Sequence, residues 1–227
     1  MLPPWFERRR KVAAVAPDAL HRSLEAGRID ALLRPLSSAE RPDLRFFEAI
    51  ARPRAAEGLL APGRYRMIAA KNGWLPWLDR MLVRRCVAHL RTAALPHLRL
   101  LCRIDPDSLS DATFVADLEA LAATSPALAS RLAVVLGRTR LPAPARSVLA
   151  CLRDRGIAVA FRRIGRHPAS PAELRRLGFD IVQLELDAGA PIPSSARFNA
   201  AGLALVVGHA DAGPVFELSD AGRQSAA

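Results

Sequence analysis

Apolar residues along this chain recur in two patterns that alternate from one segment to the next. Short, nearly continuous apolar runs bounded by turn residues are typical of buried strands. The predicted strands cover residues 31–36, 44–51, 97–104, 132–136, 157–161, 180–186 and 203–207. Apolar residues at helical spacing predict helices over 18–27, 77–90, 145–155 and 171–177, and a further helix that begins at 110 or 111. Alternating strands and helices indicate an α/β fold with parallel strands.

Two residues mark the boundaries of predicted helices. Asp111 precedes the apolar positions of its helix, where an aspartate side chain can accept a hydrogen bond from a free backbone N–H. Gly156 follows the helix over 145–155, at the place where a glycine commonly ends a helix. We therefore expect one helix to start at 110 or 111, with Asp111 as its cap, and the helix over 145–155 to end just before Gly156.

The length and composition favour one globular domain. The chain has 227 residues, of which 51% are hydrophobic and 24% charged, enough apolar material for a sizeable core. We expect residues 1–17 to form an N-terminal extension and residues 18–227 to form the domain. No stretch resembles a signal peptide or approaches the ~18 uncharged apolar residues of a membrane span. The sequence thus predicts a cytoplasmic protein without a membrane span.

The positive charge comes almost entirely from arginine. The formal net charge is +11 and the pI is about 11.2, whereas the chain has only two lysines, Lys11 and Lys71. Such a bias arises either from a GC-rich genome or from a surface that attracts phosphates or acidic partners, and the charge alone does not choose between them. No recognised nucleic-acid-binding motif accompanies the charge, so we do not expect a nucleic acid partner.

The cysteines and histidines show no spacing typical of a metal site. Cys86, Cys102 and Cys151 are far apart in apolar contexts, which predicts free thiols in a reducing compartment. The histidines have no carboxylate or cysteine partner at a ligand or triad spacing. We therefore expect no metal and no cofactor.

Two short motifs, FEAIAR at 47–52 and GLLAPGRY at 58–65, follow each other closely along the chain. Their order and spacing resemble those of EAL-type cyclic di-GMP (c-di-GMP) phosphodiesterases, and the resemblance extends over about residues 20–222. Glu48 matches the first letter of that family's name motif, and Arg52 matches an arginine that contacts a substrate phosphate. The second motif is similar to the family's Gly-x-Ile-x-Pro-x-x-Phe, with these residues in register: Gly58, Pro62 and Tyr65. The resemblance implies a (β/α)8 TIM-type barrel.

The same resemblance shows where this chain departs from the family. In the stretch GIAVAFRRIGRHPASPAELRRLGFDIVQLE at 156–185, the two aspartates of the family's Asp-Asp-Phe-Gly-Thr-Gly motif fall on Arg162 and Arg163. The lysine of its Lys-x-Asp motif falls on Gln183. Its other ligand and catalytic positions that are changed correspond to Arg34, Arg103, Val135, Arg138 and Gly208. By this comparison only Glu48 is kept.

The replaced residues decide the expected chemistry. A barrel enzyme builds its active site at the C-terminal ends of the strands, and metal-assisted phosphodiester cleavage needs oxygen ligands there. A guanidinium stays protonated and has no acceptor lone pair, so it can neither bind a cation nor take a proton. We expect Glu48 either to retain a working role or to pair with one of these arginines. The sequence therefore predicts no catalytic residues and no enzymatic activity.

Arginines at the strand ends can nevertheless bind phosphate or carboxylate through bidentate hydrogen bonds. The candidates for ligand binding, if this end of the barrel binds anything, are Glu48, Arg52, Pro62, Arg103, Arg162, Arg163 and Arg166. The other interpretation is that these arginines are ordinary solvated side chains of an arginine-rich chain. The resemblance implies a regulatory protein in bacterial signalling that acts through protein contacts, with weak or absent c-di-GMP binding. The alternative is a metal-independent receptor for c-di-GMP or another nucleotide.

One side of the expected barrel is short of covering structure. Between the strands at 180–186 and 203–207 lies a Pro- and Gly-rich loop where the resembled family has a long helix, and no eighth strand is legible. A shortened barrel of this kind need not close completely, and its apolar strand face and open edge would require cover. We therefore expect a protein partner or a homodimer on this side, at the interface candidates Val182, Leu184, Leu205 and Val207.

Overall fold

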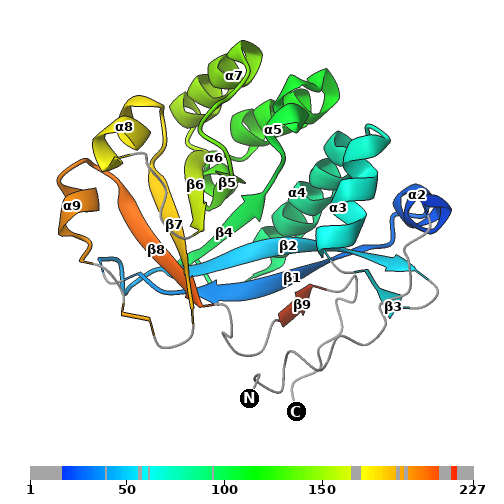
Figure 1. Cartoon of the computed structure of the whole chain (residues 1–227), viewed down its shortest axis with the longest axis horizontal. Helices are drawn as coiled ribbons and strands as arrows, with labels where there is room; N and C mark the ends of the chain where they lie inside the picture. The colour runs from blue at the N-terminus through cyan, green and yellow to red at the C-terminus, as the bar shows by residue number, and fades with distance from the viewer. Residues whose placement is uncertain are drawn as a thin grey trace.

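A computed structural model describes most of the chain (Figure 1). The described residues are 17–38, 40–55, 58–60, 62–93, 95–164, 170–187, 190–191, 194–209 and 216–218. Within these ranges, the backbone alone is described at residues 55, 58, 59, 62, 63, 163, 164 and 216–218. The predicted N-terminal extension lies outside the described residues, apart from its last residue.

Seven strands curl into one sheet in the order β8-β7-β6-β5-β4-β2-β1, which confirms the predicted α/β barrel fold in a shortened form (Figure 1). These strands are β1 Ile29–Leu36, β2 Arg45–Ala55, β4 Leu98–Arg103, β5 Leu132–Leu136, β6 Ala158–Ile164, β7 Ile181–Leu186 and β8 Ala204–His209. All seven match predicted strands. The structure adds two short strands that the sequence did not predict, β3 Gly58–Leu59 beside β2 and β9 Phe216–Leu218 beside β1.

The first strand breaks the expected parallel arrangement. Strands β2 and β4 to β8 are parallel to one another, but β1 is antiparallel to β2. The connection between β1 and β2 spans only residues 37–44. A crossover between neighbouring parallel strands needs about a dozen residues or more, so this short connection permits only the antiparallel pairing.

Helices line the outer face of the curled sheet (Figure 1). They are α2 Pro17–Glu25, α3 Pro62–Lys71, α4 Leu75–Thr92, the 3-10 helix η1 Pro106–Ser110, α5 Ala112–Thr124, α6 Pro126–Ala129, α7 Ala143–Asp154, α8 Pro171–Arg176 and α9 Ala196–Asn199. The two predicted boundary residues are confirmed: Asp111 Oδ1 accepts a hydrogen bond from Phe114 N at 2.8 Å, and Gly156 has a positive φ of 90° after α7. None of the described helices combines the length and the apolar character that a membrane span requires.

Alternate strand residues divide the apolar side chains into two clusters, because successive side chains of a strand point to opposite faces. Residues such as Val134 and Phe161 face the helices and belong to the large outer core. A smaller cluster lies inside the curled sheet and consists of Leu36, Phe46, Leu101, Ala133, Val135, Ala160, Ile181 and Val206. The charged residues of the candidate site share the strand parity of this inner cluster.

The curled sheet closes where β1 meets β8. Ser37 and Val207 form a single antiparallel bridge there, with two backbone hydrogen bonds of 2.8 Å. The edge of β8 is further occupied by Glu40, whose carboxylate accepts a hydrogen bond from Leu205 N at 3.2 Å. On β1, residues 31–33 pair with β9. The seam therefore has far fewer backbone hydrogen bonds than a full strand pair, but it is not a bare edge.

The expected exposure of the four interface candidates is wrong. Their exposed fractions are 0% for Val182, 7% for Leu184, 2% for Leu205 and 2% for Val207. The single-turn helix α9 contributes the buried side chain of Phe198 to the same core cluster, on the side that was expected to stay open for lack of a long helix. A partner on this side stays a prediction, but these side chains are not available on the surface to bind it.

Candidate functional site

Four charged side chains form a closed ring inside the sheet, which we call the mouth ring. Its members are Arg34 on β1, Glu48 on β2, Arg162 on β6 and Glu185 on β7. Arg34 donates hydrogen bonds to both carboxylates, from Nε to Glu48 Oε2 at 2.9 Å and from Nη1 to Glu185 Oε1 at 2.7 Å. Arg162 Nη2 donates to Glu185 Oε2, and Arg162 Nε lies 3.6 Å from Glu48 Oε1. Each carboxylate is thus shared by the two guanidiniums.

The mouth ring is largely removed from solvent and carries no net charge. The exposed fractions of its side chains range from 1% for Glu48 to 18% for Glu185. Buried charges are tolerated when they are paired and hydrogen-bonded, and here two positive charges balance two negative ones. Burial lowers the pKa of Arg162 to about 10, which still leaves this guanidinium protonated at neutral pH. The expected pairing of Glu48 with a strand-end arginine is therefore confirmed.

The donor set of the mouth ring does not fit a divalent cation. Mg²⁺ and Mn²⁺ need several free oxygen ligands, and both carboxylates of the ring already accept hydrogen bonds from guanidiniums. In the described part of the chain, no three His, Cys, Asp or Glu side chains are grouped as a metal site would require. Arginine offers no lone pair to a metal. The ring therefore supplies no route to a metal-activated water.

Arg34 and Gly208 are sterically matched across the seam. A Cβ built on Gly208 would lie 2.9 Å from Leu36 Cδ2 and 3.7 Å from Arg34 Cζ. A Cβ at position 208 would therefore require the end of the Leu36 side chain to shift, whereas its contact with the Arg34 guanidinium would be an ordinary van der Waals contact. Position 208 thus borders both Leu36 and Arg34 at the seam.

Glu185 is a site residue that the sequence analysis missed. It stands two positions after Gln183, which takes the place of the lysine in the family's Lys-x-Asp motif, so Glu185 takes the place of the aspartate. The comparison that left only Glu48 did not count this position, where a glutamate takes the place of the family's aspartate. The alternation of side chains between the two faces of β7 could have revealed Glu185, because it puts residues 183 and 185 on the same inner face.

Three further polar side chains near the mouth ring have unused hydrogen-bonding groups. Gln183 is fully buried, and neither its amide oxygen nor its amide nitrogen has a partner among the described residues. Arg52 donates from Nη1 to Leu60 O at 3.1 Å, but its Nε has no partner in the same part of the chain. Arg103 has no hydrogen bond to any described residue, and burial lowers its pKa while Glu48 raises it. Arg103 thus retains N–H groups that could donate hydrogen bonds to an anion, and Arg52 Nε is an unpaired donor that is itself buried.

The other sequence candidates are not brought into the ring. Arg138 lies in the exposed loop after β5, where Nη2 donates to Asp105 Oδ1 at 3.0 Å. Asp105 in turn caps η1 by accepting a hydrogen bond from Asp107 N at 3.1 Å. Arg166 lies outside the described residues. The backbone of Pro62 lies in α3 and that of Arg163 in β6, but their side chains are outside the description.

Two buried polar side chains, Tyr65 and Asp79, hold helices to neighbouring elements. Tyr65 on α3 donates from its hydroxyl to Ala51 O on β2, and burial raises the pKa of this phenol to about 12. Asp79 on α4 is fully buried and accepts hydrogen bonds from Asp105 N at 2.6 Å, Ser108 Oγ at 2.8 Å and Arg66 Nη1 at 3.1 Å. Burial raises the pKa of Asp79, and Arg66 opposes that shift. Asp79 therefore fixes η1 against α4.

The sequence model of the EAL domain matches residues 18–207 of this chain, which is most of its length. The chain belongs to the EAL domain family. No curated protein sequence matches this EAL domain at a significant level.

Solved structures share the fold of this EAL domain at low sequence identity. The FimX EAL domain of Xanthomonas citri in complex with c-diGMP is 17% identical with a TM-score of 0.69, over 88% of this chain and 92% of that chain. The FimX EAL domain from Pseudomonas aeruginosa bound to c-di-GMP is 13% identical with a TM-score of 0.60, over 85% and 92%. The PaMucR phosphodiesterase in a c-di-GMP complex is 14% identical with a TM-score of 0.64, over 87% and 96%.

Proposed function

We propose that this EAL domain is catalytically inactive and acts as a cytoplasmic regulatory protein of bacterial signalling, through contacts with other proteins. The observation that carries the proposal is the mouth ring. Its two carboxylates are bound to Arg34 and Arg162, so the acids that remain near the strand ends stabilise the barrel instead of holding a metal. The c-di-GMP complexes of the similar EAL domains support a place in the same kind of signalling.

The electrostatics of the mouth ring also disfavour metal recruitment. Before a cation could bind Glu48, the carboxylate would have to leave Arg34 and Arg162, and both guanidiniums would then lie unpaired in a largely buried space. Arg103 adds a third positive charge close enough to shift the pKa of Arg162 downward. A nearby positive field repels a divalent ion, and catalysis of phosphodiester hydrolysis depends on such an ion in the resembled enzymes.

The direct test is hydrolysis of c-di-GMP by the purified chain in the presence of Mg²⁺ or Mn²⁺. We expect no linear dinucleotide product above the buffer blank, with PaMucR phosphodiesterase as the positive control in the same buffers. Hydrolytic activity that co-elutes with the protein, is abolished by EDTA and is lost in folded Glu48→Gln would overturn the proposal. Circular dichroism of Glu48→Gln establishes that any loss of product is not a loss of fold.

The alternative, a metal-independent receptor for c-di-GMP or another nucleotide, is favoured by the unused donors of Arg52 and Arg103. We expect c-di-GMP binding weaker than ~10 µM, which corresponds to less than about 7 kcal/mol of binding free energy. Titration calorimetry measures this directly. Stoichiometric, sub-micromolar binding that is lost in Arg52→Ala but kept in the exposed-site control Arg176→Ala would make the receptor the better assignment.

A further inference from the structure

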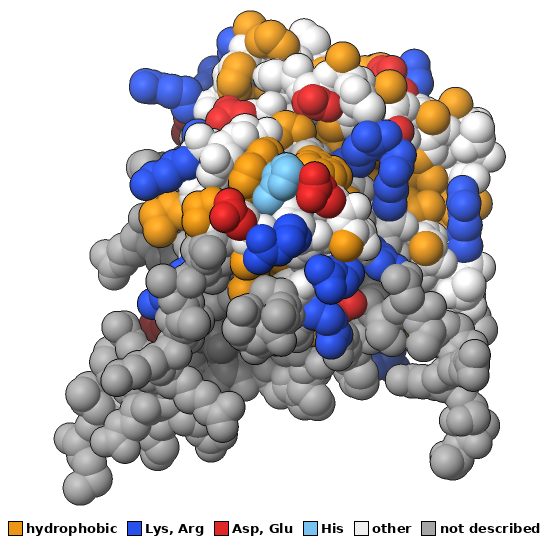
Figure 2. Space-filling view, turned by 90° about the vertical axis from the view of Figure 1, so that its right-hand side faces the viewer, with side chains coloured by type: hydrophobic (Ala, Val, Ile, Leu, Met, Phe, Trp, Pro, Cys, Tyr) orange, Lys and Arg blue, Asp and Glu red, His pale blue; other side chains and the backbone are white. Residues whose placement is uncertain are grey.

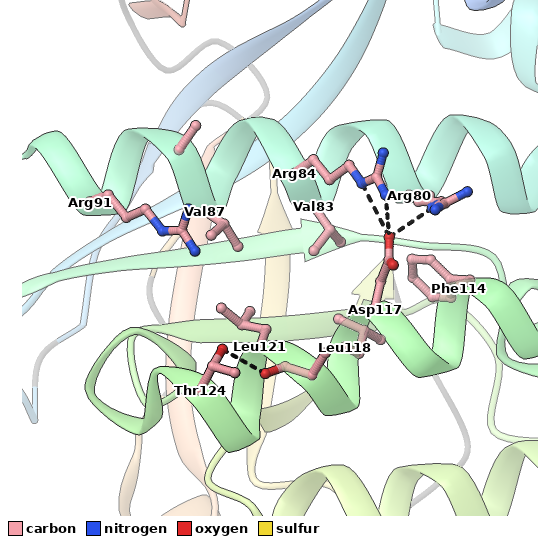
Figure 3. A pocket seen from close by; sticks show the side chains of 12 residues that line it. Arg80, Val83, Arg84, Val87, Arg91, Phe114, Asp117, Leu118, Leu121 and Thr124 are labelled. Carbon is pink, nitrogen blue, oxygen red and sulfur yellow. Dashed lines mark hydrogen bonds and ion pairs between the residues drawn. The ribbon is translucent and has the colours of Figure 1, made fainter.

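A groove of about 350 Å³ runs between α4 and α5 on the outer face of the barrel, away from the mouth ring (Figure 3). Its floor is apolar, with the buried side chains of Val83, Leu118 and Leu121. The small, exposed residues Ala88 and Ala120 line it as well, which leaves the groove open at the surface. The groove therefore offers an apolar contact surface that is accessible to a helix of another protein.

Arginines from α4 form one wall of this groove, which we call the arginine wall: Arg80, Arg84 and Arg91 (Figure 3). Arg80 Nε donates to Asp117 Oδ2 at 2.7 Å, and Arg84 Nε donates to the same oxygen at 3.1 Å. Arg91 is exposed and has no ion pair with any described residue. Three positive charges thus face one carboxylate, and the groove carries an excess of two positive charges.

On the face shown in Figure 2, Lys and Arg side chains lie among apolar side chains and several Asp and Glu side chains. The whole chain has 33 Lys and Arg against 22 Asp and Glu. A second copy would bring this same positive excess toward the arginine wall. Like charges placed opposite one another cost free energy, so the charge of the chain disfavours a symmetric contact here and favours an acidic partner.

We propose that the α4–α5 groove binds an acidic amphipathic helix of a partner protein. This inference rests on the proposed regulatory function and names the surface and the kind of partner. Arg80 and Arg91 are separated by about 16 Å along α4, at 1.5 Å per residue, which matches three turns of a bound helix. Apolar side chains of the bound helix contact Val83, Leu118 and Leu121, and its glutamates or aspartates pair with Arg84 and Arg91. Recognition of a helix by a groove between helices is a common mode of peptide binding.

The test uses a fluorescent synthetic helix of about 18 residues, or five turns, with Leu on one face and Glu on both flanks. Fluorescence anisotropy measures its binding to the full chain. The first matched probe replaces each Glu by Gln, and the second keeps the composition but scrambles the Leu spacing. We expect saturable binding of the acidic amphipathic helix, weaker binding with added salt, and at least about tenfold weaker binding of both matched probes.

Variants on either side of the molecule make the test specific for the groove. Arg84→Glu combined with Arg91→Glu should weaken binding about tenfold or more, because it reverses the charge of the arginine wall. Ala88→Phe should weaken it by filling the groove from an exposed position. Arg176→Glu on α8 is the matched control, since Arg176 is also an exposed helical arginine without an ion pair among described residues, and it should leave binding unchanged.

Several results would overturn the groove proposal. These are equal loss of binding in Arg176→Glu, equal binding of the scrambled peptide, or tighter binding of double-stranded DNA than of the helix in the same assay. Light scattering that shows a dimer dissociated by Arg84→Glu would instead assign the groove to a second copy. Circular dichroism confirms that each variant is folded. The hydrolysis assay is independent of these measurements. The groove proposal can therefore be overturned while the proposed lack of catalysis stands, and the proposed lack of catalysis can be overturned while the groove proposal stands.

Discussion

The guanidinium of Arg34 on β1 lies 2.7 Å from the carboxylate of Glu185 on β7, across the seam where the sheet closes. Strand β8 lies between the two, and its contact with β1 includes a single backbone bridge, at Ser37 and Val207. Because Arg34 also binds Glu48 on β2, one side chain ties together both sides of the seam. The mouth ring therefore supplements the few backbone hydrogen bonds that close this shortened barrel.

Removing Arg34 should destabilise the fold strongly. We expect Arg34→Ala to lower the free energy of unfolding by about 3–5 kcal/mol, because it leaves Glu48 buried with one of its two partners gone. Urea unfolding followed by circular dichroism measures the change. Arg84→Ala is the control: the Arg84 side chain is 61% exposed in its pair with Asp117, so the loss there should not exceed about 1 kcal/mol. Equal losses in the two variants would contradict the role given to the mouth ring.

Placing a methyl group at Gly208 should also destabilise the seam. We expect Gly208→Ala to cost about 1 kcal/mol, at the low end for overpacking, because the new Cβ would lie 2.9 Å from Leu36 Cδ2, the end of a side chain that can shift. In a Leu36→Ala background the same substitution should cost less, with a coupling of at least about 0.5 kcal/mol in a double-mutant cycle of urea unfolding. Additive effects of Gly208→Ala and Leu36→Ala would contradict a steric contact between these two positions.

The single tyrosine of the chain should titrate abnormally. Burial raises the pKa of Tyr65 from 10.0 to about 12, so its phenolate absorbance should appear about two pH units above that of the unfolded chain. The unfolded state ionises first, and the contribution of Tyr65 to stability is therefore complete below pH 10 and is lost as the pH rises toward 12. Tyr65→Phe should be less stable than the natural chain at pH 8, and the difference should shrink above pH 10. A phenolate signal with a midpoint near 10 in the folded protein would contradict this.

Restoring the two aspartates at the end of β6 should not restore hydrolysis. Arg162→Asp with Arg163→Asp returns the acids of the resembled motif, but Arg34 still holds Glu48 and Glu185, and Arg103, Val135 and Gly208 stay unchanged. We expect no product from c-di-GMP with Mn²⁺, and a lower unfolding midpoint because Arg162 is lost from the mouth ring. Hydrolysis by this double variant would show that the two aspartates, with the residues already present, are enough to bind the catalytic metal.

The sequence by itself determined the seven main strands, the helix start near Asp111 and the presence of arginines at the strand ends. These features depend on local periodicity and residue identity, which can be read from neighbouring positions. The family resemblance could also have revealed Glu185, two residues after Gln183. What it could not reveal is that Glu185 meets Arg34, because these residues are 151 positions apart.

The tertiary structure decided which charges compensate one another and which apolar residues are covered. The curl of the sheet brings β7 toward β1, and only that approach pairs Arg34 with Glu185 and places Gly208 close to Leu36. Likewise, α9 was not legible in the sequence, yet its buried Phe198 joins the same core cluster as Leu205 and Val207. Pattern along a sequence identifies elements, whereas burial and charge pairing depend on how distant elements pack.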